Sequence, residues 1–189
     1  MTTQPHLTLN DGVSIPQIGL GVWQVPNDQV ADVALVALEA GYRHIDTAAI
    51  YRNEAGVGEA LKRTDVARDE IFVTSKLWNA DQGYDSTLAA FDQSMKKLGL
   101  DVLDLYLIHW PVPMRDRYVD TWKAMIALRD QGRIRSIGVS NFNPGHIDRL
   151  IDETGVAPSV NQVELHPRFQ QSALRAYHGQ HGIKTESWS

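Results

Sequence analysis

Hydrophobic and polar residues alternate along the chain in a repeating rhythm of short and long segments. Short runs rich in β-branched residues or leucine are typical of buried strands, and the longer amphipathic runs between them are typical of helices. The predicted strands are Ile18–Val22, Arg43–Thr47, Ile71–Leu77, Val102–His109, Ile134–Ser140, Ser159–Glu164 and Lys184–Trp188. The predicted helices are Asp28–Ala40, Glu54–Arg63, Tyr84–Leu98, Tyr118–Gln131, Pro144–Thr154 and Ser172–His181. This alternation predicts an α/β protein built from repeated strand–helix units.

The segment before the first unit has the pattern of a β-hairpin. Leu7-Thr8-Leu9 and Val13-Ser14-Ile15 alternate apolar and polar residues around the turn sequence Asn10-Asp11-Gly12. We expect this hairpin to be a small lid added to the repeated units. No composition break or linker interrupts the rest, so we expect residues 1–189 to form a single domain.

Repeated strand–helix units form either an open doubly wound sheet or a closed barrel. The open sheet that binds dinucleotides carries G-x-G-x-x-G after its first strand. Gly19 and Gly21 supply the first two glycines here, but Gln24 stands at the third position, where close packing needs a small residue. We therefore predict a (β/α)8 TIM barrel. Because such a barrel usually takes about 250 residues, we expect this one to be incomplete, in a fragment or truncated form.

Composition and charge narrow the classes of function. Lys and Arg number 18 against 23 Asp and Glu, which gives a net charge of −5 and argues against a nucleic-acid partner. The absence of cysteine excludes disulfides, thiolate metal sites and cysteine nucleophiles. No targeting segment opens the sequence, and no apolar run approaches the roughly 18 residues of a membrane span. We expect a cytoplasmic protein with no membrane contact.

Four reactive side chains stand where predicted strands end. Asp46 closes the second strand and Tyr51 follows it, while Lys76 and His109 end the third and fourth strands. Each has a simpler explanation by itself: a carboxylate that accepts loop N–H groups, a lysine that reaches solvent, or a partly buried aromatic ring. An acid, a phenol, an amine and an imidazole at the same end of three neighbouring strands nevertheless favour one shared site.

These four residue types suit the reduction of a carbonyl by hydride transfer, which needs a proton donor where negative charge develops on oxygen. Tyr51 can donate that proton. We expect the charge of Lys76 to lower the pKa of Tyr51 from its usual value of about 10 toward neutrality. Asp46 would compensate the buried charge of Lys76, and His109 would hydrogen-bond and orient the substrate oxygen. The expected activity is that of an oxidoreductase.

Six segments, in order along the chain, form a specific combination. They are Gly41-Tyr42-Arg43-His44-Ile45-Asp46-Thr47-Ala48, Tyr51-Arg52-Asn53-Glu54, Thr74-Ser75-Lys76-Leu77-Trp78, Leu103-Asp104-Leu105-Tyr106-Leu107-Ile108-His109-Trp110-Pro111, Gly138-Val139-Ser140-Asn141-Phe142 and Asn161-Gln162-Val163-Glu164-Leu165-His166-Pro167. Through them the chain resembles the aldo-keto reductases, NAD(P)H-dependent carbonyl reductases on a (β/α)8 barrel, and within these the bacterial 2,5-diketogluconate reductase branch. The resemblance implies that Asp46, Tyr51, Lys76 and His109 are the catalytic residues, with Tyr51 as the general acid. It implies reduction of aldehydes, small ketones or dicarbonyls.

The same resemblance implies NADPH as the cofactor, with NADH as the alternative. It assigns the nicotinamide carboxamide to Ser140, Asn141 and Gln162, and stacking of the ring to Trp188, where many relatives have tyrosine. Hydroxyl and amide groups supply the donors and the acceptor that a carboxamide needs, and a flat aromatic side chain fixes one face of the ring. The other implied cofactor contacts are Gly21, Val22 and Asp46. The implied substrate-binding residues are Trp23, Tyr51, Trp78, His109 and Trp110.

The family's barrel continues past the seventh strand with a helix, a strand, a final helix and a tail. The resemblance implies that this part holds the cofactor's pyrophosphate and adenosine. We therefore expect residues 1–189 to be a single reductase barrel domain that lacks the last helix–strand–helix and the tail. The complete protein is expected to be a monomer that acts on a small-molecule carbonyl substrate.

Two other functions stay open at this point. The barrel could bind a nicotinamide cofactor and serve as a sensor or a structural subunit. More distantly, His44, Asp46 and His109 could bind a divalent ion in a metal-dependent hydrolase, although we expect His44 to be a polar residue in the barrel interior. His178 and His181 are spaced as on one helix face, but we expect them to be exposed to solvent rather than to bind zinc. The prediction is that the chain has no metal site.

Overall fold

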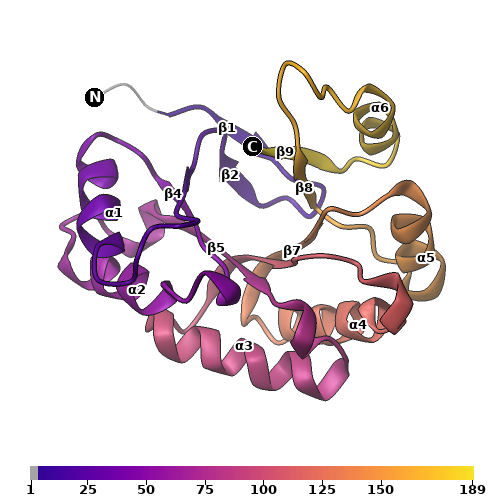
Figure 1. Ribbon diagram of the computed structural model, residues 1–189, viewed down its shortest axis with the longest axis horizontal. Helices are drawn as coiled ribbons and strands as arrows, with labels where there is room; N and C mark the ends of the chain where they lie inside the picture. The colour runs from indigo at the N-terminus through magenta and orange to yellow at the C-terminus, as the bar shows by residue number, and fades with distance from the viewer. Residues whose placement is uncertain (1–3) are drawn as a thin grey trace.

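The computed structural model describes residues 4–189, and the prediction that includes Met1–Thr3 in the domain lies partly outside the described residues. A curved parallel sheet forms the centre of the molecule (Figure 1). Its strands are β3 (Leu20–Gly21), β4 (His44–Asp46), β5 (Phe72–Leu77), β6 (Leu103–Ile108), β7 (Ile134–Ser140), β8 (Val160–Glu164) and β9 (Lys184–Trp188). Each strand pairs in parallel with the next one in the chain, which is the order of a (β/α)8 barrel, and β3 and β9 form the two edges. The predicted α/β barrel architecture is confirmed, with seven strands within residues 4–189.

Six helices lie along the outer side of this sheet (Figure 1). They are α1 (Val30–Glu39), α2 (Glu54–Arg63), α3 (Tyr84–Leu98), α4 (Tyr118–Asp130), α5 (Pro144–Thr154) and α6 (Ser172–Gln180). All seven strands and six helices are at their predicted places, with ends that differ by at most two residues. Within residues 4–189, no helix combines the length and the apolar character needed to cross a bilayer.

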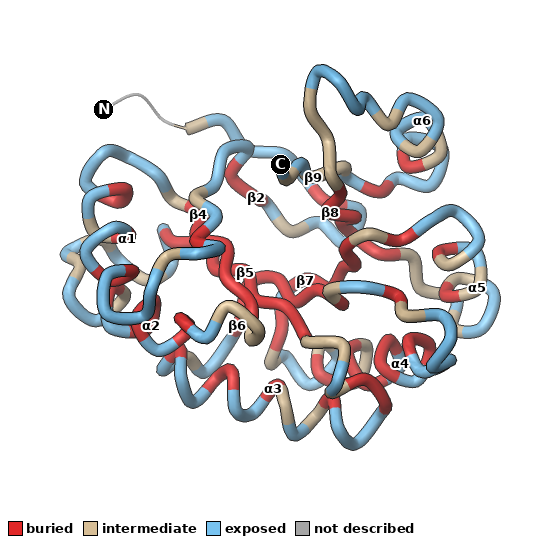
Figure 2. The backbone as a smooth tube through the Cα atoms, viewed as in Figure 1, coloured by how far each residue is buried: buried red, intermediate tan, exposed pale blue. Residues whose placement is uncertain are grey.

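The core lies between the sheet and the helices. Figure 2 shows buried residues concentrated along the central strands, and every residue of β5 and β6 is buried. Strands covered on both faces need apolar or well-partnered side chains throughout. β6 is a mostly apolar run, whereas the polar residues of β5, Thr74, Ser75 and Lys76, each have a hydrogen-bond partner. The helices contribute one face each: Phe91 and Met95 of α3 and Trp122 of α4 are buried against the strands.

The N-terminal hairpin consists of β1 (His6–Thr8) and β2 (Ser14–Pro16), which pair antiparallel. Its turn is bound to the amino-terminal end of the barrel. The Ser136 hydroxyl donates to Asp11 Oδ2 over 2.6 Å, and the side-chain amide of Asn10 donates to the carbonyl of Pro158 over 2.9 Å. The predicted hairpin is confirmed, and its turn lies at the end of the barrel where the strands begin.

Candidate active site

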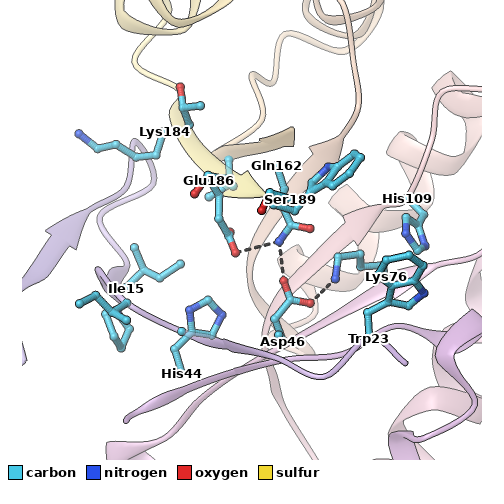
Figure 3. Close-up of a pocket in the computed structure, with 18 of the residues that line it drawn as sticks. Ile15, Trp23, His44, Asp46, Lys76, His109, Gln162, Lys184, Glu186 and Ser189 are labelled. Carbon is cyan, nitrogen blue, oxygen red and sulfur yellow. Dashed lines mark hydrogen bonds and ion pairs between the residues drawn. The ribbon is translucent and has the colours of Figure 1, made fainter. Parts of the chain in front are cut away.

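A cavity of about 1050 Å³ lies on the inner side of the curved sheet (Figure 3). Side chains from the carboxyl ends of the strands and from the loops after them line it, together with part of the hairpin. The predicted site residues that line the cavity are Gly21, Trp23, Asp46, Tyr51, Lys76, Trp78, His109, Trp110, Gln162 and Trp188. The topology explains this grouping, because the carboxyl ends of parallel strands meet at one end of a barrel.

An ion pair between Lys76 and Asp46 lies at the centre of the site. The ammonium of Lys76, which is 1% exposed, donates to Asp46 Oδ1 and to the carbonyl of Thr47, the latter over 3.0 Å. The two side chains meet because β4 and β5 are neighbours and both residues point inward. Burial alone would lower the pKa of Lys76, but Asp46 and Tyr51 raise it above its usual value overall. Lys76 therefore stays positively charged at neutral pH.

Tyr51 lies on a 3-10 turn, Ala49–Tyr51, directly after β4. Its hydroxyl oxygen is 3.5 Å from Lys76 Nζ, and Nζ lies 5.1 Å from the centre of the phenol ring. Burial raises the pKa of Tyr51 above its usual value, and the opposing effect of the Lys76 charge is smaller. The expectation of a lowered pKa is therefore wrong in direction, because burial outweighs the charge of Lys76 and the Asp46 carboxylate adds to the increase. The phenol keeps its proton at neutral pH and has it available to donate.

His109 follows β6 and packs edge-on against two aromatic rings. Its ring centre lies 5.8 Å from that of Tyr51 and 5.4 Å from that of Trp78. Burial, followed by the charge of Lys76, lowers the pKa of His109 to about 4. The imidazole is therefore neutral near pH 7 and has one N–H to donate, while its buried Nδ1 has no hydrogen-bond partner within residues 4–189. This arrangement suits a hydrogen bond to a neutral substrate oxygen.

A buried amide behind the site holds the loop that carries Tyr51. Asn53 accepts a hydrogen bond from the Thr47 hydroxyl over 2.7 Å. Its amide nitrogen donates to the carbonyls of Val22 and Val25 over 2.8 and 2.9 Å. Sequence analysis did not single out Asn53, although its place two residues after Tyr51 offered a signal. The amide connects the loop after β3 with the loop that carries Tyr51 and so fixes where the phenol lies.

The predicted cofactor residues fall into two groups. Four of them line the cavity, namely Gly21, Asp46, Gln162 and Trp188, whereas Ser140, Asn141 and Val22 are not among its lining residues. The side chains of Ser140 and Asn141 make hydrogen bonds within the protein. Ser140 donates to the Gln162 carbonyl over 2.8 Å, and Asn141 donates to the His109 carbonyl over 3.0 Å. Asn141 also accepts from Trp188 Nε1 over 3.1 Å. The Ser140 hydroxyl oxygen and Asn141 Oδ1 each still have one lone pair with which to accept a further hydrogen bond.

Val22 is placed differently from its predicted role. Its side chain is fully buried in the core, and its backbone N–H donates to the Asp46 carbonyl over 3.0 Å. Its carbonyl accepts from Asn53. Both backbone groups are thus already bound within the protein, and Val22 supports the site from behind.

The residues at the cavity wall fit a nicotinamide group. The Gln162 side-chain oxygen has no hydrogen-bond partner within residues 4–189, and Gln162 and the Trp188 indole both line the cavity. A carboxamide needs a hydrogen-bond acceptor for its amine, and a planar heterocycle packs on an aromatic face. Together these two side chains offer both features in one wall.

Glu186 on β9 is a cavity residue that sequence analysis missed. It accepts from Gln162 Nε2 over 2.8 Å, and its Oε2 is buried with no hydrogen-bond partner within residues 4–189. Burial and the nearby Asp46 carboxylate raise the pKa of Glu186 to about 7. The signal was present in the sequence, because alternate residues of a strand share a face and Glu186 is two positions before Trp188.

The histidines do not form a metal site. Across residues 4–189, no group of three or more His, Cys, Asp or Glu side chains has an arrangement that could hold a metal ion. His44 instead binds Thr74 Oγ1 through Nε2 over 2.9 Å inside the barrel. The expectation that His178 is exposed is wrong: it is 1% exposed and is held by Asn161 and Thr185 at 2.9 and 2.8 Å. His181 is exposed, as predicted.

Comparison with known proteins agrees with this geometry. The sequence profile of the Aldo/keto reductase family matches residues 17–189. An aldo-keto reductase of Mycolicibacterium smegmatis is 62% identical over 185 residues, which cover 98% of this chain and 67% of the relative. The methylglyoxal reductase DkgA of Escherichia coli K12 is 56% identical over 189 residues, which cover 100% of this chain and 68% of the relative. The chain thus spans about two thirds of the length of these relatives.

Solved structures give the same result. The crystal structure of an aldo/keto reductase from Brucella melitensis has a TM-score of 0.96 and 59% identity, and the match covers 98% of this chain and 73% of that one. A Bombyx mori aldo-keto reductase in complex with NADP has a TM-score of 0.92 and 40% identity, and the match covers 100% of this chain and 67% of that one. At these identities the likeness extends beyond the fold.

Proposed function

The chain belongs to the aldo/keto reductase family, and from this premise we propose that it reduces aldehydes, small ketones or dicarbonyls to alcohols with NADPH. The observation that carries the proposal is the buried Lys76–Asp46 ion pair beside the Tyr51 hydroxyl, in a cavity whose wall also holds Gln162 and Trp188. An acid, a base and an aromatic wall are brought together there from five different strands or loops.

NADPH, when bound, supplies the hydride that is added to the carbonyl carbon. Tyr51 donates the proton that the carbonyl oxygen takes up, and its raised pKa keeps that proton in place until charge develops on the oxygen. Lys76 then stabilises the phenolate left on Tyr51 across 3.5 Å. Asp46 holds Lys76 in position, and neutral His109 donates a hydrogen bond that orients the substrate oxygen. The alcohol product has gained the hydride on carbon and the Tyr51 proton on oxygen.

Binding of the substrate and the cofactor is assigned to separate parts of the cavity wall. Trp23 and Trp110 are exposed at 62% and 41%, and with Trp78 they line the cavity. Three indoles around a cavity suit small organic carbonyls of varied shape. Gln162 and Trp188 hold the nicotinamide end of NADPH. Further cofactor contacts are assigned to Gly21, Val22, Asp46, Ser140 and Asn141.

The relatives narrow the substrate class. Those from Escherichia coli, Salmonella typhimurium and Yersinia pestis carry the name methylglyoxal reductase DkgA, and methylglyoxal is a small dicarbonyl. This supports small dicarbonyls as substrates of the present protein. We propose NADPH rather than NADH as the cofactor, because two related aldo-keto reductase structures are complexes with NADPH and with NADP.

The test is NADPH consumption by the natural polypeptide that contains these 189 residues, in the presence of methylglyoxal and a panel of aldehydes and ketones. We expect turnover with the dicarbonyls and weaker activity with NADH. NADPH binding without reduction of any carbonyl would favour the sensor or structural alternative. Activity that a chelator abolishes would favour the hydrolase alternative.

The proposal also covers the domain organisation, the oligomeric state and the cellular location of the protein. Residues 1–189 belong to one barrel domain, and the protein acts as a monomer in the cytoplasm on a small-molecule substrate. The net charge of −5 supports the absence of a nucleic-acid partner. We expect no membrane partner. Sedimentation and cell fractionation test the oligomeric state and the location; a stable dimer or a secreted protein would contradict this part.

A further inference from the structure

The side-chain amide of Gln162 lies between two carboxylates. Its nitrogen donates one hydrogen bond to Asp46 Oδ2 on β4 and another to Glu186 Oε1 on β9, the latter over 2.8 Å (Figure 3). Gln162 and Glu186 are register partners of the neighbouring strands β8 and β9, so the backbone brings their side chains together on the inner face. Asp46 approaches the same amide from the opposite side of the cavity.

This arrangement determines which way the amide points. A primary amide has two N–H groups and one carbonyl oxygen, and a carboxylate can only accept hydrogen bonds. Both N–H groups are therefore directed at the carboxylates, and a flipped amide would place its oxygen against two acceptors. Hydrogen bonds to ionised acceptors are about twice as strong as neutral ones. The Gln162 oxygen is left without a partner within residues 4–189, in a side chain that lines the cavity.

We propose that Glu186 is a positioning residue that orients Gln162, so that the Gln162 side-chain oxygen accepts a hydrogen bond from the carboxamide amine of the nicotinamide. This inference rests on the proposed function, since it deepens the recognition of the same cofactor. Asp46 accepts one N–H group of the amide through Oδ2, and its Oδ1 is bound by Lys76. Glu186 supplies the second acceptor.

A purely structural role accounts poorly for Glu186. Its Oε2 is buried with no hydrogen-bond partner within residues 4–189, and its carboxyl group lies near a second carboxylate. Both features cost stability, since buried polar groups without partners and neighbouring like charges are unfavourable. As a carboxylate, Glu186 accepts a side-chain hydrogen bond from Gln162, whose orientation it controls, whereas its contact with Asp46 becomes a hydrogen bond only when one of the two carboxyl groups is protonated.

The test compares two ligands that differ in the amine. NADP⁺ carries a carboxamide, and its 3-acetylpyridine analogue carries a methyl ketone with no N–H at that place. In Glu186→Leu of the full-length protein, we expect the Kd for NADP⁺ to rise about tenfold, as expected for one lost hydrogen bond. The Kd of this variant for the analogue should stay within about twofold of the wild-type value. Glu186→Gln keeps an acceptor, so its Kd for NADP⁺ should lie between those of the wild type and Glu186→Leu. Glu164→Leu, a change at the end of the same β8 as Gln162, is the matched control.

Two further measurements separate positioning from folding. Glu186→Leu should add nothing to the effect of Gln162→Leu on the Kd for NADP⁺, because both changes remove the same hydrogen bond. Without any ligand, the two side-chain N–H protons of Gln162 should exchange with solvent more slowly in the wild type than in Glu186→Leu, and their NMR chemical shifts should differ between the two proteins. Equal weakening of both ligands, additive effects, or unchanged amide signals would each overturn the inference. A wild-type protein that binds neither ligand would overturn the proposed function itself.

Discussion

The ammonium nitrogen of Lys76 and the hydroxyl oxygen of Tyr51 lie 3.5 Å apart in a part of the cavity where Lys76 is almost fully buried. This contact gives the phenol a charged neighbour that stabilises its anionic form more than its neutral form. Burial, together with the Asp46 carboxylate that pairs with Lys76, raises the pKa of Tyr51, so the phenol still keeps its proton in the resting site. The pair therefore favours transfer of the proton once a basic oxygen arrives.

Removal of the lysine charge should affect both stability and turnover. Lys76→Met leaves the Asp46 carboxylate buried without its cation, and we expect the free energy of unfolding to fall by about 3–5 kcal/mol. Turnover should fall by about a hundredfold or more, because the phenolate loses its stabilisation. Urea denaturation and steady-state kinetics measure the two effects. Lys96→Met on the exposed face of α3 is the control, and equal behaviour of the two variants would refute this role of Lys76.

Replacement by alanine should affect stability differently at two glycines of the β3 region, Gly19 and Gly21. A Cβ on Gly19 would lie 2.6 Å from Nδ1 of the buried His44 ring, whereas a Cβ on Gly21 would meet no atom within 4 Å. We expect Gly19→Ala to lose about 1–3 kcal/mol of stability, because the ring has little room to shift. Gly21→Ala should fold within about 0.5 kcal/mol of the wild type. Equal melting temperatures for the two variants would contradict this prediction and would show that the His44 ring can move to make room for the methyl group.

Much of the fold could be predicted because its strands are buried on both faces. Leu103–Ile108 is a mostly apolar run and Phe72–Leu77 begins and ends with apolar residues, and both form central strands. The grouping of Asp46, Lys76 and His109 followed from topology, since parallel strands bring their carboxyl ends together. Local pattern and one topological rule were sufficient for these features.

Other features depend on three-dimensional surroundings that a sequence pattern does not encode. The direction in which the pKa of Tyr51 shifts depends on the balance between burial and the Asp46 carboxylate, which raise it, and the charge of Lys76, which lowers it. His178 is buried because Asn161 and Thr185, from two other segments, give its ring partners. Val22 follows a glycine motif but points into the core. Each of these outcomes depends on neighbours that are distant in sequence.

Acid should destabilise the protein through its buried histidines. Burial lowers the pKa of His44 to about 4 from 6.5, so between these values the unfolded chain binds a proton that the folded chain does not. Stability therefore falls as the pH drops through this window, by up to about 3 kcal/mol for this residue. His44→Gln should reduce the slope, while exposed His6→Gln should leave it unchanged. His109 and His178 also have lowered pKa values, so part of the dependence of stability on pH should remain in His44→Gln. A dependence as steep as in the wild type would contradict the prediction.

A change in cofactor affinity near pH 7 should originate from Glu186 and not from His109. The pKa of Glu186 is raised to about 7 by burial and by Asp46, with Lys76 and Gln162 opposing, whereas that of His109 is lowered to about 4. Ionised Glu186 is the stronger acceptor for Gln162, so NADPH binding should tighten about two- to fivefold as the pH rises from about 6 to 8.

The ratio of affinities between variants isolates this effect, because titration of the cofactor itself is common to all of them. Glu186→Gln should lose the pH-dependent component and His109→Gln should retain it. Loss of the component in His109→Gln alone would assign the titration to the imidazole and contradict its lowered pKa.

The most direct test of the mechanism is the turnover of Tyr51→Phe with methylglyoxal and NADPH, measured beside NADPH binding. The change removes the proton donor and leaves the aromatic ring that packs near Lys76 and His109. We predict that turnover falls by about a hundred- to ten-thousandfold while the Kd for NADPH changes less than about twofold. Tyr84→Phe, at an exposed position, should be fully active. Turnover of Tyr51→Phe at the wild-type rate would contradict the central claim that this phenol supplies the proton.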